Sequence, residues 1–349
     1  MILPEPPRIP ALESAADRPL FSVMIPVYEP GPYLLETLAS ILSQDLGTDA
    51  MQIAVLDDAS PRVDVNSLIA SSPWAKRVTV FRNERNLGLA GNWNEGIRQA
   101  RGRYVHLLHQ DDLVSPGFYA RINSGFDASS DVGMAFTRYR FIDAQGAETK
   151  RSDLERRKAG IVNNWLLRIT ERYRVHCPAA VVRRSVYESL GGFRSDLSYA
   201  LDWEMWVRIA ARYSVWFEPE PLASYRQHPD NASARLESQK ATHTDELHAM
   251  EIFANHIAAR SRASLMNRAY ARFARSRLRR VRKRIDDDSL ESAAYQLSCG
   301  RIAIERLPRG LRRSLYLSRA ARLQNALAAK SGTLQEPPPY PSPAKRGRE

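Results

Sequence analysis

The chain has 349 residues, 44% of them apolar, so it can bury a full core as one large domain with an appendage or as two modest domains. Only two cysteines occur, Cys177 and Cys299, which excludes a disulfide-framed secreted fold and a cysteine-rich metal knuckle. The net charge of +12 is unevenly placed, because residues 260–322 hold 18 Lys and Arg against 5 Asp and Glu.

These features predict a cytoplasmic protein. The N-terminal segment 1–7 has neither the basic start nor the apolar stretch of a secretory signal. Charged residues interrupt every apolar run before it reaches the roughly 18 to 20 residues that a membrane-spanning helix needs.

Short β-rich runs alternate with helical ones from residue 21 to about residue 103, which predicts a largely parallel sheet with helices connecting neighbouring strands. The four expected strands are Phe21–Ile25, Gln52–Leu56, Arg77–Phe81 and Arg103–Leu108. Apolar residues at helical spacing predict helices over Pro32–Leu42 and Gly88–Ala100.

The pattern changes after Asp112. We expect a helix from Pro116, a strand near Val132–Phe136, a turn at Asp143–Gly146, a helix at Leu201–Arg212, a strand at Ser214–Phe217 and then an irregular stretch through His228. From about Ser238 the sequence predicts almost continuous helix, broken near Asp286–Asp288 and near Pro308–Gly310. The expected organisation is an N-terminal extension (1–17), an α/β domain (18–237), a basic helical appendage (238–330) and a disordered Pro-rich tail (331–349).

Acidic residues follow three of the expected strands. Glu29 lies just after the first, Asp57 and Asp58 after the second, and Asp111 and Asp112 after the fourth. The carboxyl ends of parallel strands meet at one edge, where open α/β sheets bind ligands. Carboxylates gathered there favour a Mg²⁺ or Mn²⁺ site bridging a diphosphate, and the alternative is that each acid caps a helix or turn. Neither the dinucleotide nor the P-loop glycine pattern is present.

Four segments in this order resemble family 2 glycosyltransferases: Val23–Glu29, Leu56–Ser60, Asn86–Gly96 and Leu107–Asp112. The resemblance covers residues 18–231 and implies the GT-A fold, a nucleotide-binding α/β/α sandwich. It further implies an inverting enzyme that moves a sugar from a nucleoside diphosphate donor (UDP, GDP or dTDP) to an acceptor hydroxyl on a glycan or lipid-linked molecule, in surface polysaccharide or glycolipid synthesis.

The resemblance also implies the donor site. Its expected residues are Pro26, Val27, Tyr28, Glu29, Asp57, Asp58, Asn86, Gly88, Asp111, Asp112 and Arg226. In the family a D-x-D motif after the fourth strand holds the metal on the diphosphate, but here the triplet is His109-Gln110-Asp111, so its first carboxylate is replaced by an imidazole. Asp111 is expected to be the main metal ligand, with His109 and His228 as further candidates.

The segment Leu201–Arg208 resembles the part of the family that carries the catalytic base, and the matching acid is Asp202. A carboxylate at the acceptor side can take the proton of the attacking hydroxyl. The alternative role of Asp202 is to cap its helix. Arg226 could offset phosphate charge and His228 could bind Mn²⁺, while a purely structural role for His228 stays open.

The basic appendage has three interpretations. Its Arg-rich helices could lie on an anionic membrane, or pack against the catalytic domain as an ordinary solvated face, or bind nucleic acid, which the sparse aromatic residues make the weakest of the three. Two other functions therefore remain as alternatives: a non-catalytic sugar-nucleotide or glycan-binding module of the same fold, and a basic nucleic-acid-binding protein.

Overall fold

The computed structural model describes residues 5–12, 18–238 and 242–331. They divide into two units, one up to Ala263 and one from Ser264. The N-terminal extension is described only in part, where Ile9 is buried and the carbonyl of Pro7 accepts a hydrogen bond from Gly192 N at 2.7 Å. The expected tail, apart from its first residue, lies outside the described residues.

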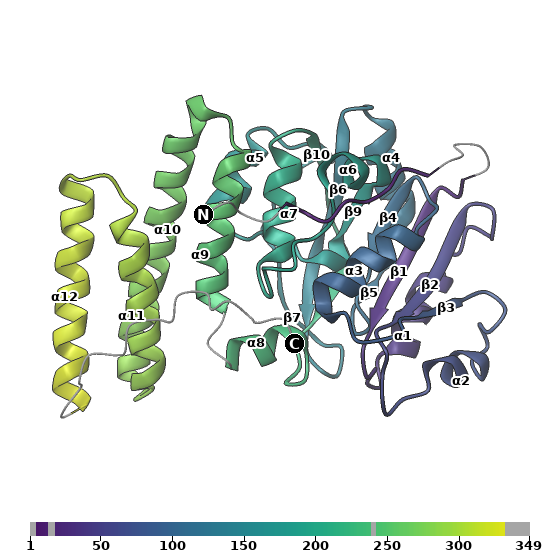
Figure 1. The fold of residues 1–349 in the computed structure, drawn as a ribbon, viewed down its shortest axis with the longest axis horizontal. Helices are drawn as coiled ribbons and strands as arrows, with labels where there is room; N and C mark the ends of the chain where they lie inside the picture. The colour runs from purple at the N-terminus through teal and green to yellow at the C-terminus, as the bar shows by residue number, and fades with distance from the viewer. Residues whose placement is uncertain (1–4, 13–17, 239–241, 332–349) are drawn as a thin grey trace. The chain divides into compact units, whose positions relative to one another are not determined.

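The first half of the sheet is parallel, as the sequence predicts. Its strands lie side by side in the order β3-β2-β1-β4 (Figure 1). Their bounds are β1 Phe21–Val27, β2 Met51–Asp57, β3 Thr79–Arg82 and β4 Tyr104–Leu107. The connecting helices are α1 Leu34–Leu42, α2 Val65–Ala70 and α3 Gly88–Gln99. The expected strands and helices in this half are therefore confirmed to within a few residues at each end.

Helices cover both faces of β1, and for this reason the strand is buried along its whole length. Alternate side chains point to opposite faces, so Val23 and Ile25 join the core that contains Leu38 of α1. Met24 points the other way, toward Gly96 of α3, where an added Cβ would overlap Leu56. The glycine therefore lets α3 approach the sheet closely.

The second half of the sheet is mixed rather than parallel. The short strand β9 (Ala180–Arg183), which the sequence did not reveal, lies antiparallel between β4 and β6 (Val132–Ile142). The expected strand at Ser214–Phe217 continues as β10 through Arg226, so the stretch expected to be irregular is mostly strand. The two-residue strand β5 (Leu113–Val114) closes the order β4-β9-β6-β10-β5, while β7 (Glu148–Arg151) and β8 (Gly160–Ile161) pair with β6 and β10.

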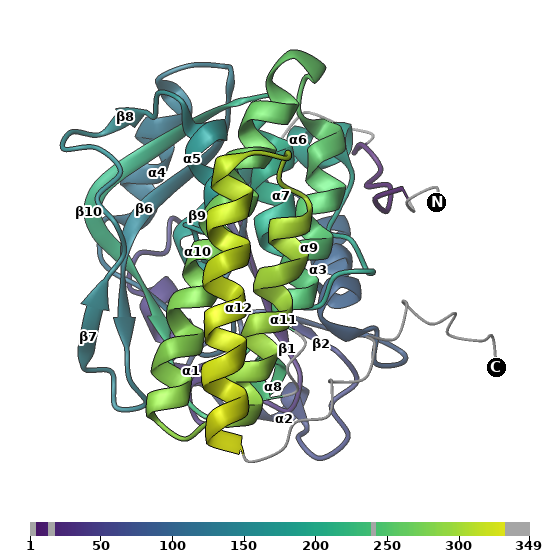
Figure 2. The same cartoon turned by 90° about the vertical axis from the view of Figure 1, so that its left-hand side faces the viewer.

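The remaining helices of the first unit surround this half. They are α4 Phe118–Asp127, α5 Trp165–Glu171, α6 Arg184–Leu190, α7 Leu201–Ala210, α8 Ala232–Ser238 and α9 Thr242–Phe253, with 3-10 turns at Cys177–Ala179 and Ala254–His256. Helix α4 packs on β6 and β10, and α9 packs on α7 (Figures 1 and 2).

The second unit is helical, as expected. It contains α10 (Ala259–Asp286, from Ser264 onward), α11 (Leu290–Glu305) and α12 (Leu311–Ser331), and the helices break at the two predicted places. Helices α11 and α12 lie side by side in both views (Figures 1 and 2). The expected boundary at residue 238 would assign α9 to the appendage, whereas the contacts group α9 with the first unit. Among the described helices, none is both long and apolar enough to span a bilayer.

Candidate active site

A cavity of about 380 Å³ lies where the carboxyl ends of β1 and β4 meet the starts of α3 and α7. The rest of its wall comes from the end of β2, the segment 173–177, the end of β10 and helix α8. Most of the predicted site residues line it, namely Pro26, Val27, Tyr28, Asp58, Asn86, Gly88, His109, Asp111, Asp202 and His228. Four predicted residues do not: Glu29, Asp57, Asp112 and Arg226. Segments far apart in the sequence therefore converge on one site.

Asp58 shapes the wall at the end of β2. Its carboxylate accepts hydrogen bonds from Leu87 N (2.8 Å), Gly88 N (3.0 Å) and Asn83 Nδ2 (2.8 Å). Gly88 has a φ of +72°, a conformation that suits glycine. Asp58 thus ties the loop that carries Asn86 to the sheet and sets the width of this end of the cavity.

Glu29 and Asp57 lie behind the cavity wall and do not line the cavity. Glu29 accepts hydrogen bonds from Arg62 N (2.8 Å) and Arg62 Nε (2.5 Å). Asp57 is fully buried, pairs with Arg82 and accepts a hydrogen bond from Ser60 N at 3.0 Å. Both carboxylates therefore hold the loop after β2, and neither side chain faces the cavity. Their contact with the nucleoside stays a prediction.

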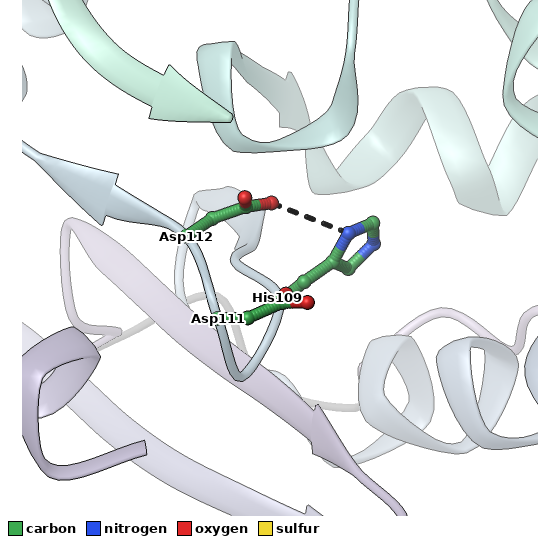
Figure 3. Close-up of side chains that lie close together, drawn as sticks. All are labelled: His109, Asp111 and Asp112. Atoms are coloured by element: carbon green, nitrogen blue, oxygen red, sulfur yellow. Dashed lines mark ion pairs between the residues drawn. The ribbon is translucent and has the colours of Figure 1, made fainter. Parts of the chain in front are cut away.

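The loop after β4 brings His109, Asp111 and Asp112 together (Figure 3). One ligand atom from each lies within 4.8 Å of the others. His109 stacks on Trp93, with ring centroids 4.9 Å apart, and its Nδ1 lies 3.4 Å from Asp112 Oδ2. The buried Nε2 of His109 and Oδ2 of Asp112 have no hydrogen-bond partner among the described residues. Within this described part, Asp112 Oδ2 is engaged only by its ion pair with His109, and the lone pair of His109 Nε2 is available to a cation.

Burial raises the pKa of Asp112 to about 6, and His109 opposes this shift. Burial works against a charge on His109, but its contact with Asp112, together with the charges of Asp111 and Asp202, outweighs burial and raises the pKa of the imidazole. Asp112 Oδ1 is already occupied, because it accepts a hydrogen bond from Arg226 N at 2.9 Å. Asp111 is therefore the carboxylate of this loop that faces the cavity directly.

His228 reaches the same carboxylate from the end of β10. Its Nε2 lies 2.9 Å from Asp111 Oδ2, and its ring packs against Tyr33 at a centroid distance of 5.0 Å. The structure thus places both candidate imidazoles, His109 and His228, on the same cavity as Asp111.

Arg226 is buried behind the loop instead of facing the cavity. Its side chain donates to Glu36 Oε2 (2.7 Å) and to the carbonyl of Asp111 (2.9 Å), and the guanidinium lies over the ring of Tyr33. Its remaining donors reach the carbonyls of Asp143 and Ala144. A direct role in offsetting phosphate charge has no support in this placement. Arg226 instead positions Asp111 and Asp112.

Asp202 lies in the first turn of α7, and its side chain lines the same cavity from this helix. Its Oδ2 accepts a hydrogen bond from the hydroxyl of Tyr173, and its Oδ1 accepts one from Trp203 N at 2.8 Å. Burial raises the pKa of Asp202 to about 6, although these two hydrogen bonds oppose the shift. The N-cap position belongs to Ala200, so Asp202 is not the cap of this helix.

The sequence did not indicate two residues that hold Asp202 and the segment before α7 in place. Tyr173 contacts Asp202 and also lies 3.0 Å from His176 Nδ1, and the ring of His176 stacks on Tyr225. Asp245 of α9 accepts hydrogen bonds from Tyr199 N and Ala200 N, both at 2.7 Å, and so anchors the segment that leads into α7. No local sequence signal marks either residue, because both act through tertiary contacts.

Comparison with known proteins identifies the family. Residues 22–191 match the model of glycosyl transferase family 2. An uncharacterized glycosyltransferase of Methanocaldococcus jannaschii is 30% identical over 227 residues, covering 64% of this chain and 77% of the relative. This chain belongs to glycosyltransferase family 2. The protein is therefore an enzyme, a glycosyltransferase, and this favours catalysis over the two alternative functions.

Solved structures show that this glycosyltransferase has the GT-A fold. S. aureus TarS in complex with UDP-GlcNAc superposes with a TM-score of 0.60 at 15% identity, over 89% of this chain and 90% of that one. A mannosyltransferase from Pyrobaculum calidifontis in complex with GDP-Man and Mn²⁺ superposes with a TM-score of 0.55 at 19% identity, over 91% and 87%. At these identities the likeness establishes the fold alone.

Parts of two longer proteins are also similar to this glycosyltransferase. The minor teichoic acid biosynthesis protein GgaB of Bacillus subtilis is 34% identical over 109 residues, which cover 31% of this chain and 12% of GgaB. The O-antigen biosynthesis protein RfbC of Myxococcus xanthus is 28% identical over 233 residues, which cover 64% of this chain and 17% of RfbC.

Proposed function

We propose that this enzyme transfers a sugar from a nucleoside diphosphate donor to an acceptor hydroxyl, with inversion at the anomeric carbon. One observation carries the proposal: Asp111, at the end of β4, and Asp202, at the start of α7, line the same cavity. A single displacement needs two groups. One carboxylate helps to hold the diphosphate, and a separate carboxylate takes the proton of the attacking hydroxyl.

The donor's nucleoside is proposed to lie against Pro26, Val27 and Tyr28, with Asp58 and Asn86 at the same end. Backbone groups of this segment and the side-chain amide of Asn86 can form hydrogen bonds with an uncharged nucleoside base. The structural neighbours bind UDP-GlcNAc and GDP-Man, which differ in both base and sugar. We therefore propose UDP-, GDP- or dTDP-sugars as the donor class for this chain.

A divalent cation fits the loop after β4. Asp111 supplies a half-buried carboxylate that lines the cavity, and His109 Nε2, which has no hydrogen-bond partner among the described residues, is buried beside it. A mixed oxygen and nitrogen set suits Mn²⁺ better than Mg²⁺, which prefers oxygen ligands alone. We propose Asp111 as the main ligand, with His109 and His228 as the candidate imidazoles. When bound, such an ion neutralises charge on the departing diphosphate.

Asp202 is the proposed general base. The acceptor oxygen forms a bond to the anomeric carbon while the bond from this carbon to the diphosphate breaks, and that electron pair leaves with the diphosphate. The acceptor proton passes to the carboxylate of Asp202. The hydroxyl of Tyr173 fixes one oxygen of this carboxylate and Trp203 N fixes the other, so the group is held in place before the acceptor arrives.

The acceptor is proposed to be a glycan or a lipid-linked precursor of a surface polysaccharide or glycolipid. This part rests on the names of two partial relatives, a teichoic acid and an O-antigen biosynthesis protein. Such acceptors are built at membranes, and we infer that the basic helices of residues 260–322 meet an anionic membrane surface from the cytoplasmic side. Both cysteines are buried and no disulfide joins them in the described part of the chain, as suits a reducing compartment.

The donor proposal is tested by thermal unfolding of the full chain with UDP-, GDP- and dTDP-sugars, each with Mn²⁺ or with EDTA. We expect one base to raise the melting temperature, and EDTA to remove that increase, because metal and diphosphate bind together. Release of the nucleoside diphosphate is then followed with the donor that binds. No stabilisation by any donor in the presence of Mn²⁺ would contradict the proposal.

The pKa of Asp202 predicts a pH dependence. The base acts as the carboxylate, so kcat/KM should fall about tenfold per pH unit below about pH 6. In Tyr173→Phe the carboxylate loses a donor that lowers its pKa, so the acidic limb should move upward by roughly one pH unit. The measurement is kcat/KM against pH at saturating Mn²⁺, with Tyr213→Phe, outside the cavity, as the matched control. If the acidic limb of the kcat/KM profile of Tyr173→Phe coincides with that of wild type, the hydrogen bond from Tyr173 does not set the pKa of Asp202.

A further inference from the structure

A second cavity, of about 460 Å³, lies on the helical unit between α10 and α12. Four arginines and two leucines line it: Arg275, Arg279, Arg312, Arg319, Leu311 and Leu315. Tyr316 completes the lining, and its hydroxyl accepts a hydrogen bond from Arg275 Nε at 3.4 Å. We name this surface the arginine groove.

The arginine groove has uncompensated positive charge. No acidic side chain contributes to its lining, and none of its four arginines forms an ion pair within the part of the chain that the structure describes. Guanidinium groups gathered in this way repel one another and attract anions, and their planar donors suit phosphate oxygens. The charge of the groove therefore fits a phosphate-bearing partner.

The leucines narrow the choice of partner. Leu311 is 79% exposed and Leu315 is 61% exposed, and they lie one helical turn apart on α12. Large apolar side chains this exposed, with basic residues around them, mark a surface that meets an apolar phase. A nucleic acid or a soluble polyanion would engage the arginines but would leave both leucines in water.

We propose that the arginine groove docks on the surface of an anionic lipid bilayer. Arg275, Arg279 and Arg312 contact lipid phosphates, and Leu311 and Leu315 enter the boundary between headgroups and acyl chains. This deepens the membrane contact named in the proposed function and rests on it, because it assigns that contact to one groove of α10 and α12.

The test is flotation of the purified full chain with vesicles of phosphatidylcholine alone or of phosphatidylcholine mixed with phosphatidylglycerol. We expect binding to the mixed vesicles only. The triple variant Arg275→Gln, Arg279→Gln, Arg312→Gln should bind about 100-fold more weakly, since each basic residue near the surface contributes about fivefold. The control Arg280→Gln, Arg301→Gln, Arg309→Gln removes the same charge from exposed positions outside the groove and should bind as wild type.

The leucines separate the membrane from other polyanions. Leu311→Gln with Leu315→Gln keeps every charge and replaces only exposed side chains, so it should fold normally and bind mixed vesicles about tenfold more weakly. Wild-type flotation by this variant, or tight binding of duplex DNA in place of vesicles, would overturn the proposal. An equal loss in the control triple variant would also overturn it. Stabilisation of the full chain by a donor with Mn²⁺ needs no vesicle, so failure of the docking and failure of the enzymatic proposal give different results.

Discussion

Asp202→Asn is expected to lower the rate of sugar transfer by about 10³-fold, within the range that general base catalysis contributes. Asparagine has nearly the size of aspartate and can still accept the hydrogen bond from Trp203 N. It has no basic oxygen to take the acceptor proton. The measurement is kcat with a saturating donor, together with the melting temperature, which should change little.

Two controls make the Asp202 result specific. Asp127→Asn changes an exposed aspartate on α4, outside the cavity, and should transfer sugar at the wild-type rate. Donor binding by Asp202→Asn should also persist, because the diphosphate is proposed to lie at the other carboxylate. Full transfer by Asp202→Asn would reject Asp202 as the base.

Asp111→Asn is expected to reduce transfer by about 10³-fold or more, because loss of a cation at the diphosphate removes several kcal/mol of transition-state stabilisation. Asp111 is the carboxylate of the loop after β4 that lines the cavity, and His228 Nε2 lies 2.9 Å from it. The variant keeps the backbone carbonyl that accepts from Arg226, so the loop should stay in place.

The two variants serve as controls for each other. Asp111→Asn should lose the thermal stabilisation that donor and Mn²⁺ produce together, whereas Asp202→Asn should keep it. If Asp111→Asn retains both this stabilisation and transfer, Asp111 does not hold the metal. If it loses both while His109→Ala keeps both, Asp111 holds the ion without that imidazole.

The first half of the fold and the composition of the cavity could be predicted from sequence because both follow from local patterns. Buried parallel strands give continuous apolar runs, and polar residues directly after β1, β2 and β4 must share one edge. The same argument could not separate Asp57 from Asp58. Adjacent side chains point to opposite sides of the chain, and only the position of Arg82 and the loop at Gly88 decides which one faces the cavity.

The second half of the sheet was harder to predict, for two physical reasons. Strand β9 has four residues and follows Pro178, so its pattern is too short to stand out. Strand β10 contains Pro219 and Pro221, which lack an amide donor and lie at the register irregularities of its pairing with β6. Prolines are typical of loops, and the sequence therefore suggested an irregular stretch where the strand in fact continues.

The supporting residues of the site depend on contacts between distant parts of the chain. Arg226 seemed suited to phosphate from its charge alone, yet Glu36 and the carbonyl of Asp111 take up its donors. Tyr173 and Asp245 hold Asp202 and the segment before α7 from elements that no motif marks. Charge and residue type indicate what a side chain can do, whereas its neighbours decide which role it takes.

The configuration of the sugar at the moment of release tests single displacement with Asp202 as base most directly. Proton NMR of the full chain with Mn²⁺ and the donor that it binds, with water as acceptor, can record the first anomer before mutarotation. We predict that the α-linked donor gives the β-sugar first, in wild type and not in Asp202→Asn. Release of the α-sugar first would contradict single displacement and the role of Asp202.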